Sequence, residues 1–204
     1  MADGTLKVGT ITTSSGSGTI TLGQSGETVD MSNATQTGVG GTNTPAFFSY
    51  LGGSGGQSVG GNAITKITIN TELFDSGGCF NNTSGSVSLN GITTPSYAFA
   101  PNVAGKYLVF GAIQYEAGSN TELQEDYLYF KVNGSNYYES QNDFQANNIR
   151  LNILHGSILA DLNGTSDYIE IYARMGTSGS TQLLESDTQY KKATHFGAYR
   201  IIGA

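Results

Sequence analysis

The chain has 204 residues, of which only 12% are charged, and its formal net charge at pH 7 is −7. This charge argues against a nucleic-acid-binding protein, because such a protein needs a basic surface to displace counterions from phosphates, and it also disfavours binding to anionic lipid headgroups. The 29 glycines, together with abundant Ser, Thr and Asn, favour strands and turns over helices. We therefore predict an all-β protein without nucleic-acid partners. No apolar run approaches the roughly 20 residues that span a bilayer, so we also expect no membrane insertion.

Residues 1–44 differ in composition from the rest of the chain. Two GTIT blocks, at 9–12 and 18–21, indicate a small hairpin with too little apolar area to be stable alone. Residues 32–44 have the composition of a flexible linker. We predict an N-terminal attachment arm and linker over 1–44, with a disordered tail as the alternative, and a head domain over 45–204. The first ten residues have neither the basic nor the apolar segment of a signal peptide, so we expect none.

Strand-like runs then follow one another to the C-terminus, separated by turn residues. Three Asn-Gly pairs each predict a tight type I′ hairpin turn, since both residues tolerate positive φ; they are Asn90-Gly91, Asn133-Gly134 and Asn163-Gly164. About ten short strands joined in this way are typical of a β-sandwich or jelly roll. Cys79 is the only cysteine, so stability must come from packing or assembly rather than from an intrachain disulfide.

Several of these strands have two apolar faces where a sandwich needs one. Side chains in a strand point alternately to opposite faces, and the run from Lys106 to Glu116 is largely apolar on both. The strands DYLYFKV and THFGAYRII share this property. A second apolar face predicts contact with another copy of the chain, although tyrosine is also an ordinary residue on an exposed strand. The candidates for the core or for a trimer interface are Tyr107, Val109, Phe110, Ile113, Tyr115, Tyr127, Tyr129, Phe130, Phe196 and Tyr199.

A set of short motifs recurs in a characteristic order from Pro45 to Ala204. They are Pro45-Ala46-Phe47, Phe74-Asp75, Tyr97-Ala98-Phe99-Ala100-Pro101, Gly105-Lys106-Tyr107, Asn133-Gly134, Asp167-Tyr168-Ile169 and Phe196-Gly197-Ala198-Tyr199. In these motifs the region resembles the globular head of complement C1q, a relative of the tumour necrosis factor fold. The resemblance implies a ten-stranded jelly roll, a homotrimer whose inner sheets meet at the threefold axis, and binding of other molecules through exposed loops without catalysis.

Some proteins of this family bind calcium near the trimer apex. The nearest acidic residues here are Glu122, Glu125 and Asp126, which cannot be matched to that site residue by residue. We expect them to form a solvated loop and strand entrance, and we predict no cofactor and no metal, with calcium as the remaining alternative.

The arm resembles a different group of proteins. The Gly-X-Y period of a collagen stalk is absent, and LKVGTITTSSGSGTITLGQSGETVDM is similar in composition and layout to the low-complexity, β-rich modules that begin tail-fibre and other virion proteins of tailed phages. This resemblance implies a virion protein, assembled in the host cytoplasm, in which residues 1–44 contact other virion proteins.

Two features raise the question of an enzyme. Gly52-Gly53-Ser54-Gly55-Gly56 matches the nucleophile-elbow pattern G-x-S-x-G, but the pattern needs a helix after it, and QSVGGNAIT does not predict one. His155 and His195 could meet in space, yet single strand histidines are more often packed or surface residues than bases or ligands. We expect no enzymatic activity.

The segment SNYYESQNDFQANN (135–148) suggests a ligand-binding loop. Its aromatic and amide side chains can stack on and hydrogen-bond to sugars, although an ordinary exposed polar loop is the alternative. The ligand-loop candidates are Tyr137, Tyr138, Asn142 and Phe144. Our hypothesis is a receptor-binding fibre tip that recognises a host-surface glycan or protein. The alternatives are a capsid decoration protein and, from another class, a cellular binding module of the complement type.

Overall fold

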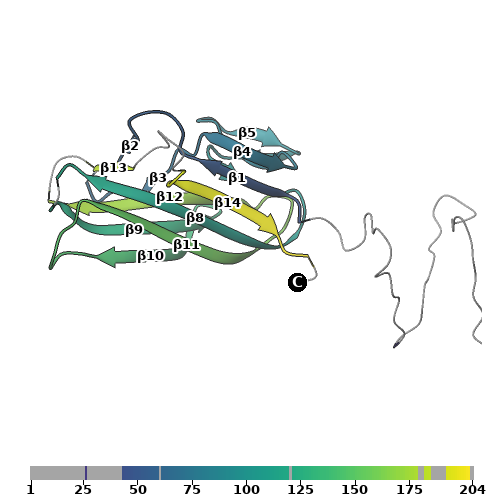
Figure 1. Cartoon of the computed structure of the whole chain (residues 1–204). Helices are drawn as coiled ribbons and strands as arrows, with labels where there is room; N and C mark the ends of the chain where they lie inside the picture. The colour runs from purple at the N-terminus through teal and green to yellow at the C-terminus, as the bar shows by residue number, and fades with distance from the viewer. Residues whose placement is uncertain are drawn as a thin grey trace, which may run out of the picture. The chain divides into compact units, whose positions relative to one another are not determined.

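The computed structural model describes residue 26 and residues 43–59, 61–119, 121–178, 182–184 and 192–202. The chain divides into two units, Met1–Val39 and Gly40–Ala204. The hairpin expected at 9–21 lies outside the described residues. Every strand shown in Figure 1 belongs to the second unit.

The first of two large sheets has seven antiparallel strands. Its centre is β8 (Gly105–Ala117), which pairs with β11 (Leu151–Leu162) on one side and with β14 (His195–Arg200) on the other. Figure 1 shows β14 lying between β8 and the next strand, β1 (Ala46–Tyr50). The remaining members are β4 (Thr71–Ser76), which pairs with β1, and the short strands β13 (Gln182–Leu184) and β2 (Gln57–Ser58).

The second sheet has five strands and packs face to face with the first. Its main strands are β10 (Ser135–Asp143), β9 (Leu123–Val132) and β12 (Ile169–Thr177), while β3 (Thr65–Lys66) and β7 (Ala98–Phe99) pair with β12. A separate hairpin joins β5 (Val87–Leu89) to β6 (Ile92–Thr94). The predicted all-β jelly-roll sandwich is confirmed. The described residues form fourteen strand segments, because runs such as 63–74 are interrupted rather than continuous.

The core is filled by the inward side chains of both sheets. Phe47 on β1 stacks on Phe80 and Phe99, at ring-centroid distances of 4.5 and 4.6 Å, and meets the edge of Phe196 at 5.0 Å. The sheets approach closely at Gly111 on β8, where a Cβ atom would lie 2.6 Å from Cδ1 of Ile171 on β12. A side chain at position 111 would therefore force the two sheets apart.

Two of the three Asn-Gly pairs form the hairpin turns that were predicted. Asn90-Gly91 joins β5 to β6, and Asn133-Gly134 joins β9 to β10, with φ of 51° at both asparagines. The prediction for Asn163-Gly164 is wrong, because it connects β11 to β12, which belong to different sheets. There the Asn163 Oδ1 accepts hydrogen bonds from the backbone N–H groups of Thr165, Ser166 and Asp167, which shapes a crossing loop instead of a hairpin.

Candidate functional site

The candidate site is the side of the first sheet that faces away from the core, called the outer face below. Strand pairing arranges its side chains in rows across β11, β8 and β14. One row contains Leu159, Leu108 and Tyr199, the next Ser157, Phe110 and Gly197, and the third His155, Ala112 and His195. On β1, Phe48 extends the second row, since it pairs with Gly197.

The outer face is largely apolar and partly exposed to solvent. Leu159 is 58% exposed and Leu151 is 48% exposed, while Phe48, Leu108 and Phe110 are half-buried. Further large apolar side chains on these strands exceed one-third exposure, namely Phe74, Ile153 and Tyr199. The paired strands place these residues next to one another, so the outer face is a continuous apolar patch and not a scatter of single apolar residues.

Phe110 is the central ring of the outer face. Its ring lies 6.2 Å from that of Phe48 and 6.4 Å from that of His195, measured between centroids. The side chain spreads over Gly197, where a Cβ atom would lie 2.5 Å from Phe110 Cζ. The glycine thus lets a phenylalanine lie flat on the neighbouring strand.

His155 and His195 lie beside this ring. Their ring centroids are 6.4 Å apart, on either side of Ala112. The Nδ1 atom of His195 is 2.8 Å from the carbonyl oxygen of Lys192. Burial lowers the pKa of His195, and the nearby His155 lowers it further, while the contact with Lys192 acts in the opposite direction.

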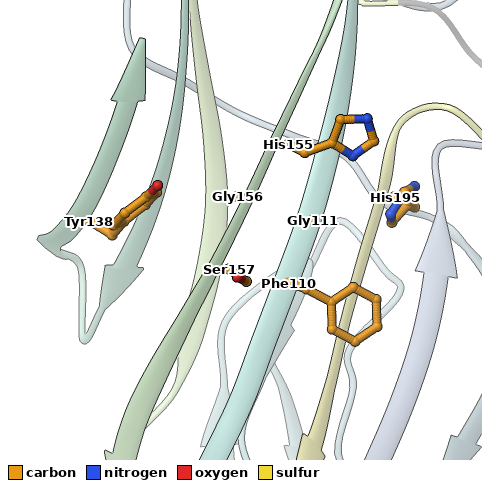
Figure 2. A pocket seen from close by; sticks show the side chains of 7 residues that line it. All are labelled: Phe110, Gly111, Tyr138, His155, Gly156, Ser157 and His195. Atoms are coloured by element: carbon orange, nitrogen blue, oxygen red, sulfur yellow. The ribbon is translucent and has the colours of Figure 1, made fainter.

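A pocket of about 430 Å³ opens at this place, with both histidines in its wall (Figure 2). Figure 2 shows Phe110 and the two imidazoles on β8, β11 and β14, while Tyr138 comes from β10 of the other sheet. The lining residues are Phe110, Gly111, Tyr138, His155, Gly156, Ser157 and His195.

The pocket does not contain a nucleophile and base in contact. Among the described residues, no hydrogen bond joins Ser157 to either histidine, whereas an activated serine needs a base within about 3 Å. The G-x-S-x-G pattern at Ser54 also lacks the strand-turn-helix context of a nucleophile elbow. The segment after it is strand β2, and Gly52 is held by the Asn70 side chain, with Gly52 N donating to Oδ1 at 2.8 Å.

The side of the second sheet that faces away from the core is also aromatic, but it is covered by the chain's own cations. The Arg174 guanidinium lies 4.4 Å from the ring centroid of Tyr127, and the Lys131 ammonium lies 4.2 Å from that of Tyr172. The rings of Tyr127 and Tyr129 stack at 6.1 Å. Burial, together with Glu170, raises the pKa of Tyr172 to about 12. Because these rings already have cationic partners in the same chain, this side of the second sheet is not an uncovered apolar face.

The structure therefore separates the sequence candidates into three groups. The first faces the sandwich core, and the second lies on the outer face of the first sheet. The third lies on the side of the second sheet that faces away from the core, where Tyr129 is nevertheless buried. The core group is Tyr107, Val109, Ile113, Tyr115, Phe130 and Phe196; the outer-face group is Phe110 and Tyr199; the third is Tyr127 and Tyr129.

The outer face also contains apolar residues that were not among the sequence candidates, on β1, β4 and β11. They are Phe48, Phe74, Leu151, Ile153 and Leu159. The signal was present in LNILHGSIL, where Leu151, Ile153 and Leu159 fall on the same alternate positions.

The prediction of a ligand loop over 135–148 is wrong for its first nine residues, which form the edge strand β10. Pairing with β9 gives these polar residues a regular ladder. Tyr137 is 55% exposed, and its hydroxyl donates to the Leu159 carbonyl oxygen. Tyr138 and Phe144 pack against the core, and Asn142 Nδ2 donates to Asp126 at 3.0 Å. These contacts do not test binding, so a ligand role for the four candidates stays a prediction.

The three acidic residues considered for calcium have separate surroundings. Glu122 accepts a hydrogen bond from the Ser119 backbone N–H, and Glu125 forms an ion pair with Arg174 at 3.3 Å. The expectation of a solvated position is wrong for Asp126, which is fully buried. Burial raises the pKa of Asp126, while hydrogen bonds from the asparagine side chains that reach it lower it.

The described part of the chain contains no group of three or more His, Cys, Asp or Glu side chains placed to hold a metal ion. Nor does it include a helix with the length and apolarity needed to cross a bilayer.

No family model and no curated protein matches the sequence. Among solved structures, the fold is similar to that of the complement C1q globular domain. The globular domain of zebrafish complement 1qA superposes with a TM-score of 0.50 and 15% identity, over 77% of this chain and 96% of that one. Murine APRIL gives 0.48 and 11%, covering 76% and 99%, and the Eiger tumour necrosis factor of S. frugiperda gives 0.48 and 12%, covering 78% and 93%.

Proposed function

We propose that the protein is a non-enzymatic homotrimeric head whose outer face is the seam between subunits. The observation that supports this proposal is the apolar outer face itself, which stays uncovered by the rest of the described chain. Complete burial of one exposed leucine or phenylalanine contributes about 1.5 to 3 kcal/mol. Several such residues from each of three chains would offset the entropic cost of association.

The contrast between the two sheets favours the first sheet as the one that forms the seam. Both sheets have aromatic residues on the side away from the core, but those of the second sheet are covered by Arg174 and Lys131. The Phe110 row has a histidine neighbour and no described ion pair across it. Association centred on the Phe110 row would bury apolar area and leave the charged pair Lys106–Asp161 two rows away. Association through the second sheet would strip water from Arg174 and Lys131.

We further propose that the trimer is part of a phage virion, with residues 1–44 attached to the particle and the head exposed, as a fibre tip that binds a host-surface glycan or protein. The support is the composition of residues 1–44 and their position before the head. The same arm and head would also suit a capsid decoration protein. The two roles differ only in where the protein lies on the particle, at the tail tip or on the shell. A secretion signal or a collagen repeat elsewhere in the gene would favour the remaining alternative, a cellular complement-type binding module.

Light scattering of the full chain tests the trimer. The expected mass is near three times 21.4 kDa. A monodisperse monomer at micromolar concentration would contradict the proposal, because the apolar outer face would then be stable in water.

Imaging of particles with a label fused to the C-terminus tests the virion role. Label at the distal end of the tail supports the fibre tip, and label over the shell supports decoration. Particles without label, in a preparation whose cells contain the labelled protein, would contradict both roles.

A further inference from the structure

We infer that the trimer seam is acid-labile, and that His155 and His195 on the outer face make it so. The inference rests on the proposed homotrimer and adds its regulation. It follows from where the two imidazoles lie, what surrounds them and what assembly would do to their hydration.

The two imidazoles belong to the apolar centre of the outer face. His195 stacks on Phe48 with 5.1 Å between ring centroids and an interplanar angle of 25°, and it meets Phe110 at 6.4 Å. His155 lies 6.4 Å from His195 and is exposed in the single chain. Burying the Phe110 row against another copy would therefore also remove water from the histidines.

Charged groups on the neighbouring strands do not offer a carboxylate to a protonated imidazole. On β8 and β11, Glu116 forms an ion pair with Arg150, and Lys106 lies 3.4 Å from Asp161, three rows from the histidines. On β4, the acidic residues are Glu72 and Asp75, which pair with the inward positions Ser49 and Phe47 of β1. On β14, Arg200 pairs with the inward Tyr107.

Residues 192–194, which are the described part of the loop before β14, contain no acidic residue, and neither does strand β1. Lys192 offers its carbonyl oxygen to His195, and its ammonium lies 5.1 Å from the ring centroid of Tyr50 on β1. A second positive charge on the neighbouring imidazole would be repelled at this separation. Protonation of both histidines in a closed seam is therefore unfavourable.

The direction of the pH effect follows from this environment. Burial disfavours the charged imidazole, so separated chains bind more protons than the trimer, and acid shifts the equilibrium toward separated chains. Assembly is complete above the ordinary histidine pKa of about 6.5 and weakens as the pH falls below it. A histidine of ordinary pKa that stays neutral in the trimer raises the dissociation constant by about 25-fold per chain between pH 7 and pH 5, and three chains enter the trimer. The factor is smaller for His195, because burial already lowers its pKa in the single chain.

The two histidines should contribute unequally. Burial already lowers the pKa of His195 within a single chain, so assembly changes its proton binding less. His155 is exposed before assembly and loses more hydration. His155 should therefore account for the larger share of the acid effect.

The experiment is sedimentation velocity of the full chain at pH 7.5, 6.5, 5.5 and 5.0, at matched ionic strength and with a chelator to exclude metal bridging. The expected result is a trimer at pH 7.5 and a growing monomer fraction below pH 6. The variant His155→Gln should need a pH about one unit lower for the same monomer fraction. His195→Gln should shift it less, and the double variant should stay trimeric at pH 5.0. Far-ultraviolet circular dichroism at pH 5.0 checks that the monomer remains folded.

Four other outcomes would each contradict a different part of this reasoning. A wild-type trimer that is unchanged at pH 5.0 overturns the acid-labile seam and leaves the homotrimer standing. Equal dissociation of wild type and double variant overturns the role of the histidines. A monomer at every pH, including 7.5, overturns the homotrimer and with it this inference. An unfolded chain at pH 5.0 also contradicts the inference, since dissociation would then follow from loss of the fold.

Discussion

Phe110 on β8 lies directly over Gly197 on β14, so closely that a methyl group at position 197 would come within 2.5 Å of the ring. The two residues are paired across the strands. Phe110 can lie flat on the outer face only because its neighbour has no side chain, and the position of the central ring on this face therefore depends on a glycine.

The first prediction concerns the two faces of β8. Phe110→Glu places a charge on the outer face, where the monomer can hydrate it, so we expect a folded monomer. Tyr107→Glu places a charge in the core, where Tyr107 is fully buried and its hydroxyl donates to the Val103 carbonyl oxygen at 2.6 Å. We expect this variant to unfold. Light scattering and circular dichroism distinguish the two results, and a folded, trimeric Phe110→Glu protein would contradict the seam.

The second prediction concerns Gly197. Gly197→Ala must displace Phe110 or separate β8 from β14, at a cost of about 1 to 3 kcal/mol in the free energy of unfolding. Gly85→Ala is a matched control, because a Cβ atom at Gly85 meets no atom within 4 Å. Urea titration of both variants in the Phe110→Glu background measures folding without assembly. In that background the phenylalanine ring is absent, so Gly197→Ala should lower the free energy of unfolding much less than it does in the wild type. An equal loss from Gly197→Ala in the wild-type and Phe110→Glu backgrounds would show that the ring is not the obstacle.

The third prediction concerns Asp126, whose Oδ1 and Oδ2 accept hydrogen bonds from the Asn142 and Asn152 amides. Burial raises the pKa of Asp126 in the folded protein, so the folded state holds its proton more tightly than the unfolded state. Ionisation of Asp126 therefore reduces stability at neutral pH, and this loss is recovered as the pH falls through the folded-state pKa.

Asp126→Asn removes this titration. The difference in unfolding free energy between wild type and Asp126→Asn should change in favour of the wild type from pH 7 to pH 4. Asp126→Ala leaves two amides without their acceptor and should cost about 2 to 3 kcal/mol. Guanidinium titration at several pH values measures both effects. A pH-independent difference between wild type and Asp126→Asn would mean that the carboxyl group does not titrate differently in the fold.

The fourth prediction concerns Asn81, which is almost fully buried and organises the segment between β4 and β6. Its Nδ2 donates to the carbonyl oxygens of Gly85 and Pro95 at 2.7 and 2.9 Å, and its Oδ1 accepts from the Thr83 backbone N–H. Asn81→Ala should lower the unfolding free energy by about 2 to 3 kcal/mol. The neighbouring Asn82→Ala should change it by less than about 0.5 kcal/mol. Equal losses from the two substitutions, measured by urea titration, would contradict the role given to Asn81.

The sequence predicted the fold class because alternation and turn residues act locally. Alternation in β8 identified two apolar faces, but the choice between them depends on the strands that pair with it and on the sheet that it faces. The Asn163-Gly164 pair has the same local signal as Asn133-Gly134, yet the next strand joins the other sheet. No local pattern contains that information.

The errors within 123–148 have the same origin. Apart from Tyr137 and Tyr138, the edge strand β10 is polar, so its sequence resembles that of a loop. The burial of Asp126 depends on Asn142 and Asn152, which are 16 and 26 residues further along the chain. The joint position of His155 and His195 was left open by the sequence, because it requires β11 and β14 to flank β8.

The two sheets should therefore evolve under different constraints. In a threefold assembly, a substitution on the outer face of the first sheet alters all three contacts between subunits. A substitution among Tyr127, Tyr172 and Arg174 alters only contacts within each chain. Among natural variants, we expect more substitutions on the second sheet, where they can change what the surface binds. We expect fewer on the outer face of the first sheet, because each one changes the contacts between subunits.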